Sequence, residues 1–390
     1  MSREQPRILI LDGMWNKTLA AVRSLGARGF NVSVGEKTHL ATALFSRYCS
    51  KRLIYPSPSE RPQAFLDKLK YELARGEYDA LFPMEWTTQA LITDPVNRQQ
   101  FERYTKIPFA NADLAELVND KARLMRYAKR HGVEVPLTMF MNGSEDLRGV
   151  ADTIDYPVVI KPRISSGSRG LAYAWDRSEL LRKYPAVHER YPFPIIQEYI
   201  PGSEVYGVAL LLNFQSQVRA SFVYKRLRSY PVAGGPSTLR VSAKRDDLQD
   251  IAGHLLQSLK WIGIAHVEFK IDPRNGRPKL LEVNPRFWGS LALAIEAGID
   301  FPFLLYKLAM EEDVEPVNDY AGGVMCRWLI PGDLLHFIHN PQRFKLQPGF
   351  FDFRMKDDIM SLHDPLPTLG RVLSVFTLLS DKEMRGIIRR

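Results

Sequence analysis

The chain has 390 residues, of which 45% are hydrophobic and 25% charged, a composition that excludes a largely disordered, collagen-like or coiled-coil protein. Its length is enough for two or three subdomains, and its two cysteines, Cys49 and Cys326, exclude a disulfide framework or a cysteine-based zinc cluster and favour a reducing compartment such as the cytoplasm. The formal net charge of +9 is compatible with nucleic acid, an anionic membrane, phosphorylated ligands or simply a basic surface.

The N-terminal segment predicts the start of a doubly wound α/β domain. An apolar run at 7–11, too short for a signal peptide, precedes a helical pattern and then an alternating strand at 30–34. The first turn, residues 12–17, lacks the three-glycine dinucleotide fingerprint, so a nicotinamide or flavin site is not supported. A later strand at 78–83 would place Glu85 at the ligand-binding edge of the sheet, either facing a ligand or as an exposed residue at a helix start.

The pattern then changes to short strands broken by loops. We place domain boundaries near residues 115 and 315, giving an α/β domain at 1–114, a second domain at 115–315 with subdomains of about 115–200 and 201–315, and a C-terminal extension at 316–390. No apolar stretch approaches the roughly 18 residues that a transmembrane helix needs. The end of the extension, 370–390, mixes apolar and basic residues, which is typical of a core-packed terminal helix or of an amphipathic helix on a membrane surface.

A lysine and a Ser/Gly loop form the first polar constellation. The strand at 158–160 ends in Lys161, a point charge suited to a phosphate oxygen, although the Walker spacing is absent. The loop that follows offers serine hydroxyls and glycines whose N–H groups can approach an anion: Ser165, Ser166, Gly167, Ser168 and Gly170. Taken alone, such a loop is more often a plain hairpin.

An apolar strand at 195–200 runs into a Pro-Gly turn and an acid. The backbone of Glu198, Tyr199 and Ile200 can offer alternating N–H and C=O groups to an adenine edge, and Glu204 can accept both hydroxyls of a ribose. By itself this segment could equally be an ordinary strand and turn.

Two strands around 265–272 and 279–286 predict an antiparallel hairpin with acids on one face. Glu268 lies on the polar face of the first strand, and Glu282 and Asn284 lie on that of the second. Three such oxygen donors suit Mg²⁺, which keeps several waters and bridges phosphates. A solvent-exposed hairpin with scattered charges is the alternative.

The register of this hairpin decides whether the acids meet. A symmetric two-residue turn about Asn275 and Gly276 would oppose Glu268 to Val283, on the wrong face. The prolines at 273 and 278 argue for a longer, adjustable loop, so we expect Glu268 to lie level with 282–284.

The order of these three pieces, closed by the sequence LLEVNPR at 280–286, resembles the ATP-grasp superfamily of carboxylate–amine and carboxylate–thiol ligases. The resemblance covers about residues 1–315. It implies an α/β and α+β fold in which a doubly wound domain precedes a two-lobed nucleotide clamp. It also implies ATP and Mg²⁺, with Mn²⁺ as a substitute, and a cytoplasmic ligase that activates a carboxylate as an acyl phosphate and transfers it to an amine.

The same resemblance implies roles for single residues. Lys121 and Lys161 would contact the α- and β-phosphates, the loop from Ser165 to Gly170 would close over the triphosphate, and Glu268, Glu282 and Asn284 would hold the metal. The adenine and ribose contacts would come from residues 198–200 and Glu204.

Four further residues are candidates for catalysis. Arg286 can bind the acyl phosphate or a substrate carboxylate through its bidentate fork, or else pair with Glu282. Lys225 and Arg240 flank a Gly-Gly-Pro-Ser-Thr loop that resembles the one over the γ-phosphate, and a basic surface loop is the alternative. Some dipeptide-forming members carry an arginine where this chain has His266, which either acts in a pH-dependent way or is merely packed.

Other functions remain open at this stage. A carboxylase-type or purine-pathway-type enzyme activating bicarbonate or formate is the enzymatic alternative, and a basic nucleic-acid or membrane-surface protein is the non-enzymatic one. The basic residues are dispersed without a nucleic-acid recognition module, so no nucleic acid is expected. A homodimer and a peripheral membrane contact of the C-terminal tail are compatible with the sequence, which names neither the acid nor the amine.

Overall fold

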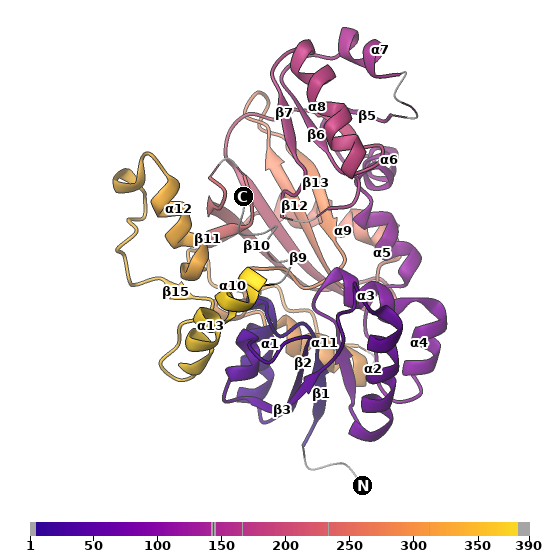
Figure 1. Ribbon diagram of the computed structural model, residues 1–390, viewed down its shortest axis with the longest axis vertical. Helices are drawn as coiled ribbons and strands as arrows, with labels where there is room; N and C mark the ends of the chain where they lie inside the picture. The colour runs from indigo at the N-terminus through magenta and orange to yellow at the C-terminus, as the bar shows by residue number, and fades with distance from the viewer. Residues whose placement is uncertain are drawn as a thin grey trace.

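The computed structural model describes residues 5–141, 143, 146–165, 167–232, 234–311 and 313–380, with side chains up to residue 374. Three β-sheets organise this part of the chain (Figure 1). The strand predicted at 78–83 is shorter in the structure, at Ala80–Phe82, because Pro83 cannot donate to a ladder.

The N-terminal sheet is parallel and has the strand order β3-β2-β1-β4, which confirms the predicted doubly wound domain. Strands β1, β2 and β4 are buried because helices cover them, and the first strand is almost wholly apolar for this reason, whereas the edge strand β3 is largely exposed. The elements are β1 (Arg7–Ile10), α1 (Asn16–Ala27), β2 (Asn31–Glu36), the 3-10 helix η1 (Thr42–Phe45), β3 (Cys49–Ile54), α2 (Pro62–Gly76), β4 (Ala80–Phe82), α3 (Trp86–Thr93) and α4 (Pro95–Phe101).

A small lobe follows, built on an antiparallel sheet of order β5-β8-β6-β7 and at the top of Figure 1. It has a hydrophobic core of its own, centred on the buried strand β6. Its elements, with the two helices that lead into it, are α5 (Ala112–Asn119), α6 (Lys121–Arg130), β5 (Thr138–Met139), α7 (Asp146–Thr153), β6 (Val158–Lys161), β7 (Ala172–Ala174), α8 (Arg177–Arg190) and β8 (Ile195–Glu198).

The largest sheet has seven strands in the order β13-β12-β9-β10-β11-β14-β15. Its elements up to residue 311 are β9 (Val205–Leu212), β10 (Val218–Ser229), β11 (Ser237–Ala243), α9 (Asp246–Ser258), β12 (Gly263–Ile271), β13 (Pro278–Asn284), α10 (Leu291–Ala297) and α11 (Phe301–Glu311). The sheet and the N-terminal domain share a core in which Phe287 packs against Phe82 and Phe109 at ring separations of 5.9 and 6.3 Å. This shared core fixes the N-terminal sheet beside the end of β13.

The C-terminal segment is joined to both larger sheets. It contains β14 (Met325–Arg327), the π-helix η2 (Leu329–Asp333), α12 (Leu334–His339), the 3-10 helix η3 (Arg343–Lys345), β15 (Lys356–Asp357) and α13 (Leu366–Ser380). Strands β14 and β15 form one edge of the seven-stranded sheet. Helix α13 packs on η1, where a Cβ added to Gly370 would lie 2.6 Å from the Phe45 ring, and Arg371 donates to Met14 O at 2.9 Å. Over residues 366–374 the helix therefore packs on the core, whereas residues 381–390 lie outside the described residues. The boundaries at 115 and 315 stay predictions.

Candidate active site

The hairpin of β12 and β13 brings the predicted metal ligands together. His266 pairs with Asn284, Val267 with Val283 and Glu268 with Glu282, so the two glutamates lie directly opposite each other on one face. The Asn284 amide donates to Glu282 Oε1 at 3.0 Å. The predicted convergence of these three oxygen donors is therefore present in the structure.

A β-bulge is what sets this register. Near the turn Phe269 pairs with Leu280, and the pairing then shifts by one residue between Glu268 and Phe269. Without the bulge Glu268 would pair with residue 281, and Glu282 would lie one position further along the strand. The turn is also longer than two residues, as expected, since Ile271 pairs with Pro278.

Lysines of two different elements approach the same face. Lys121 is the first residue of α6, behind the N-cap Asp120, and its Nζ lies 3.5 Å from Glu282 Oε2 and 3.0 Å from Ser165 O. Lys161 ends β6 and donates to Gln197 Oε1 at 2.5 Å. The small lobe therefore supplies cations opposite the acids of the large sheet.

The two lysines favour a bound anion, and the two facing glutamates favour a bound cation. Burial and the neighbouring Lys121 lower the pKa of Lys161 to about 8, whereas burial, partly offset by Arg226, raises the pKa of Glu268. Burial opposes ionisation of Glu282, but Lys121 and Asn284 outweigh it and lower the pKa. Two carboxylates facing each other repel unless cations lie between or beside them.

The donor set fits Mg²⁺ in the form it usually takes at phosphates. Among the residues that the structure describes, no group of three or more His, Cys, Asp and Glu side chains converges as a metal site. Mg²⁺, however, is commonly held by one or two carboxylates together with substrate phosphates and water. Glu268, Glu282 and the Asn284 amide therefore fit an ion that arrives with a triphosphate.

The Ser/Gly loop has a left-handed backbone at several positions. Gly167, Ser168 and Gly170 have φ of 59°, 62° and 73°. Gly170 is also sterically required, because a Cβ there would lie 2.5 Å from the Tyr191 ring. Backbones of this kind turn N–H groups toward an anion. Ser165 is described, whereas the predicted donor Ser166 lies outside the described residues.

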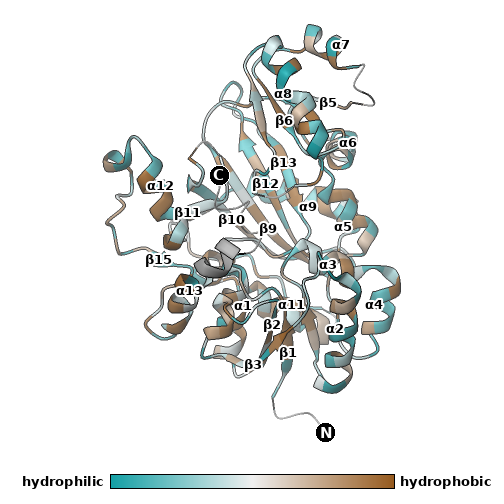
Figure 2. Ribbon diagram, in the orientation of Figure 1, coloured by the Kyte–Doolittle hydropathy of each residue, from teal (hydrophilic) through white to brown (hydrophobic). Residues whose placement is uncertain are grey.

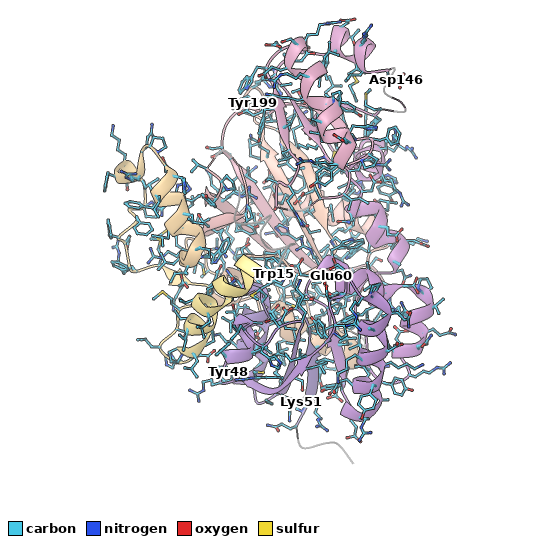
Figure 3. All side chains as sticks on the ribbon, in the orientation of Figure 1. Trp15, Tyr48, Lys51, Glu60, Asp146 and Tyr199 are labelled. Carbon is cyan, nitrogen blue, oxygen red and sulfur yellow. The ribbon has the colours of Figure 1, made fainter. Side chains whose placement is uncertain are left out.

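The predicted adenine linker is largely committed to the protein. The N–H groups of Glu198 and Tyr199 donate to Leu137 O at 2.8 Å and Pro157 O at 3.1 Å. The backbone carbonyls and the N–H of Ile200 would then be the linker's groups for a base. Tyr199, labelled in the upper part of Figure 3, packs edge-on against Tyr173 with ring centroids 5.9 Å apart.

The predicted ribose acid and one predicted catalytic lysine form an ion pair. Lys225 pairs with Glu204, and its Nζ also lies 5.6 Å from the centre of the Tyr206 ring. This contact holds Lys225 at the ribose acid in the protein without ligand.

Arg240 and His266 are both buried. Arg240 is 1% exposed and its Nη2 lies 2.8 Å from Asp358 Oδ2. His266 stacks between Tyr224 and Trp288, its Nε2 lies 3.0 Å from the Tyr224 hydroxyl, and burial lowers its pKa to about 3. His266 is therefore neutral at physiological pH, and Arg240 already neutralises a buried acid.

Arg286 lies beside an open cleft of about 250 Å³ between the N-terminal domain and the Ser/Gly loop. The lining residues are Glu85, Trp86, Thr87, Asn119, Ile164, Ser165, Arg169, Tyr191 and Arg286. Glu282 forms an ion pair with Lys121 rather than with Arg286, whose Nη1 donates to Phe287 O at 3.1 Å.

The charged wall of this cleft depends on a buried pair. Lys17 Nζ lies 2.5 Å from Glu85 Oε1, and burial together with the nearby Arg286 lowers the pKa of Lys17 to about 8. Burial opposes ionisation of Glu85, but Lys17 and Arg286 outweigh it and lower the pKa of Glu85. Asp12 positions Glu85 by accepting its backbone N–H at 2.8 Å, so the β1 edge of the N-terminal sheet holds this acid in place.

Comparison with known proteins agrees with this geometry. A family model described as "ATP-grasp in the biosynthetic pathway with Ter operon" matches residues 191–329. The carbamoyl phosphate synthase large chain of Pseudomonas putida is 25% identical over 225 residues, covering 55% of this chain but only 21% of the relative's length. A biotin carboxylase complex from Campylobacter jejuni has a TM-score of 0.69 at 18% identity, over 83% of this chain and 74% of the other. An L-amino acid ligase from Bacillus licheniformis has a TM-score of 0.61 at 16% identity, over 80% and 76%.

Residues 191–329 form an ATP-grasp domain, the family whose model they match. The predicted resemblance and fold class are thereby confirmed, including the α/β domain ahead of the two ATP-grasp lobes. The chain spans only 21% of the length of the first of these curated relatives, so the activity of the whole relative is not assigned to this chain.

Sequence reasoning missed two residues within the ATP-grasp site. Arg226 Nη2 donates to Glu268 Oε2 at 2.9 Å, and the Gln197 amide oxygen accepts the proton of Lys161. Strand alternation could have indicated Arg226 instead of its neighbour Lys225, since adjacent residues on β10 face opposite sides of the sheet. Lys17, the second residue of α1, gave no such signal.

Phe287 and Trp288, which directly follow Arg286, are 0% and 2% exposed and belong to the core.

Proposed function

We propose that this protein is an ATP-dependent ligase that activates a carboxylate as an acyl phosphate and transfers it to an amine. The observation that carries the proposal is the convergence of Glu268 and Glu282 on one face of the large sheet with Lys121 beside them. Lys161 of the small lobe adds a second cation, which would contact the triphosphate.

The first half-reaction follows from these positions. An oxygen of the substrate carboxylate attacks the γ-phosphorus, the bond to the β,γ-bridging oxygen breaks, and ADP leaves with that electron pair. Lys121 and Lys161 hold the phosphates by charge, and Glu268, Glu282 and Asn284 would hold Mg²⁺. When bound, that ion neutralises charge on the β- and γ-oxygens.

In the second half-reaction the amine attacks the carbonyl carbon of the acyl phosphate. Inorganic phosphate leaves with the electrons of the C–O bond, and the amine nitrogen loses a proton. Arg286 is suited to the carboxylate and then to the acyl phosphate, because its planar fork matches two oxygens at once. Glu85, ionised beside Lys17, is an acceptor for an amino group.

The mixed charge of the cleft indicates the class of substrate. The guanidiniums of Arg169 and Arg286 and the carboxylate of Glu85 line the same cleft, together with apolar side chains such as that of Ile164. Such a lining suits a molecule that carries a carboxylate, an amino group and some apolar surface, as an amino acid does. The amino acid ligase among the similar structures is consistent with this assignment.

Activation of bicarbonate or formate is the second candidate. It is favoured by the carbamoyl phosphate synthase and biotin carboxylase among the similar proteins. The lining of the cleft favours an organic substrate, since the apolar side chain of Ile164 has no use for bicarbonate or formate.

Trapping of the acyl phosphate tests the proposal. The protein is incubated with Mg-ATP, hydroxylamine and a panel of amino acids and small carboxylates, and ADP and hydroxamate are measured. We expect hydroxamate and ADP in equal amounts with at least one organic acid. ADP formation that depends only on bicarbonate would favour the second candidate, and absence of ADP formation with every acid would contradict ligase activity.

A further inference from the structure

Exposed apolar side chains are concentrated in one stretch of the C-terminal segment. Of the twenty large apolar side chains that stand exposed among the described residues, ten lie between residues 334 and 372. The most exposed are Leu362 at 98%, Phe344 at 80% and Phe353 at 72%. Helices α12 and α13 and strand β15 lie together on the left side of Figure 1, and Figure 2 shows brown along both helices.

The exposed charges of the same stretch all have one sign. The exposed lysines and arginines between residues 334 and 372 are Arg343, Lys345, Arg354 and Lys356. The four acids of the stretch are buried or half-buried: Asp352, Asp357, Asp358 and Asp364. Asp358 is used by Arg240 and Asp364 by Arg23, whereas Arg354 pairs with Asp352 and Lys356 with Glu296. Among the described residues of the stretch, Arg343 and Lys345, on either side of Phe344, are therefore the exposed basic residues that form no ion pair.

Arginine and aromatic side chains are also interleaved. The Arg343 guanidinium lies 5.4 Å from the centre of the Phe344 ring, and that of Arg327 lies 5.4 Å from the Phe353 ring. Basic groups next to exposed apolar side chains are the composition of segments that lie in the interface of an anionic bilayer.

We propose that residues 334–372 form a docking surface for an anionic phospholipid membrane. Lipid headgroups would contact Arg343, Lys345 and Arg354, and the side chains of Phe344, Phe353 and Leu362 would enter the acyl boundary. No helix of the described chain is long and apolar enough to cross a bilayer, so this attachment would be to one surface.

Other occupants fit the observations less well. A second copy in a two-fold dimer would place this basic surface against itself, with the two sets of charges repelling each other. Single-stranded nucleic acid would use stacking aromatics, whereas much of the exposed surface is aliphatic, as at Leu362, Leu366 and Leu369.

Vesicle sedimentation of the full chain tests the proposal. We expect binding to vesicles of phosphatidylcholine mixed with phosphatidylglycerol, at least about tenfold tighter than to phosphatidylcholine alone, and weaker at high salt. The double variant F344S/F353S should lower the partition coefficient at least about tenfold, because two rings no longer leave water. The double variant R343E/K345E should lower binding to the anionic vesicles by a similar factor.

Matched variants and a second measurement keep the outcomes distinct. Y71S/F214S removes two exposed aromatic side chains elsewhere, and R103E/K106E makes the same charge change after α4; both should bind as the unchanged protein does. ATP affinity checks that every variant is folded. The proposal would be overturned if the protein did not bind anionic vesicles, or if the F344S/F353S and Y71S/F214S variants bound them equally well. It would also be overturned if the protein bound no vesicles but formed a concentration-dependent dimer, or a complex with an oligonucleotide, that F344S/F353S abolished.

Discussion

The acidic end of the site and the cleft around Arg286 are built in different ways. The acids Glu268 and Glu282 sit on neighbouring strands of one hairpin, so their meeting depends on local register. The cleft joins Glu85, from the N-terminal domain, to Arg286, at the end of β13, about 200 residues later in the chain. The pair of acids that serves the nucleotide thus depends on contacts between residues close in the sequence. The cleft that would select the substrate depends on contacts between residues far apart in the sequence.

The electrostatics differ in the same way. At the acidic end Glu282 pairs with Lys121 and Glu268 with Arg226, and the two carboxylates face each other as oxygen donors suited to Mg²⁺. In the cleft Lys17 and Glu85 already neutralise each other. Substitutions at Glu268 or Glu282 should therefore affect ATP binding and phosphoryl transfer, whereas substitutions in the cleft should affect the choice of substrate.

The largest effect is expected for Glu282→Gln. Removal of one carboxylate charge from the metal end should lower Mg²⁺-dependent ADP formation by at least about 10²-fold, because a metal ion supplies several kcal/mol at a phosphoryl group. ADP release is measured by a coupled assay, and circular dichroism checks the fold. Glu189→Gln, at an exposed position, is the matched control. Full activity in Glu282→Gln would contradict the metal assignment.

Lys161→Ala should raise the Kd for ATP by about 10- to 100-fold, the range expected for loss of a hydrogen bond to a charged group. Isothermal titration calorimetry measures this Kd, with the exposed Lys129→Ala as the control. An unchanged Kd would show that Lys161 does not contact the phosphates.

Arg286→Lys should affect substrate binding in the cleft rather than nucleotide binding. Loss of the bidentate fork is expected to raise KM for the carboxylate about tenfold while the Kd for ATP changes less than about twofold. Glu85→Gln should instead raise KM for the amine. Steady-state kinetics with each substrate varied in turn separates the two. An equal loss of ATP affinity in Arg286→Lys would place this residue in the nucleotide site.

The pH dependence of ATP binding should report Lys161. Its pKa of about 8 means that the ammonium is charged below that pH and neutral above it. Because the triphosphate favours the charged form, the Kd for ATP should rise by up to about tenfold per pH unit above about pH 8. Calorimetry between about pH 7 and pH 9 measures this slope. Lys161→Arg should flatten it, and an unchanged slope in that variant would assign the effect to another group.

The smallest effect on catalysis is expected for His266→Gln. With a pKa of about 3, His266 is neutral throughout the usual range, so the pH profile of kcat/KM between about pH 5 and pH 8 should keep its shape. Stability should fall by about 1–2 kcal/mol in urea unfolding, because the buried contact of the imidazole with the Tyr224 hydroxyl and its stacking on Tyr224 and Trp288 are lost. An acid limb in the unchanged protein that disappears in His266→Gln would show that this histidine titrates during catalysis.

Much of the nucleotide end could be predicted because its signals are local. The alternation around Glu268 and Glu282 and the position of Lys161 at the end of an apolar strand are visible within short windows of sequence. The β-bulge was not predicted, although the alignment of Glu268 with residues 282–284 that it produces was predicted. Gly207 illustrates what stays hidden: a Cβ there would lie 2.4 Å from the Tyr224 ring and 2.6 Å from His266 Nε2, a constraint imposed by the neighbouring strands.

The sequence by itself determined the class of fold, the order of the nucleotide-binding segments and the oxygen donors of the hairpin, because strand periodicity and short turns fix which side chains share a face. Only the tertiary structure decided that Lys17 and Glu85 meet Arg286, that Arg240 is buried against Asp358, and that the C-terminal segment completes the large sheet while leaving a basic, apolar surface. These contacts join residues far apart in the chain, and packing of the shared core around Phe287 brings several of them together.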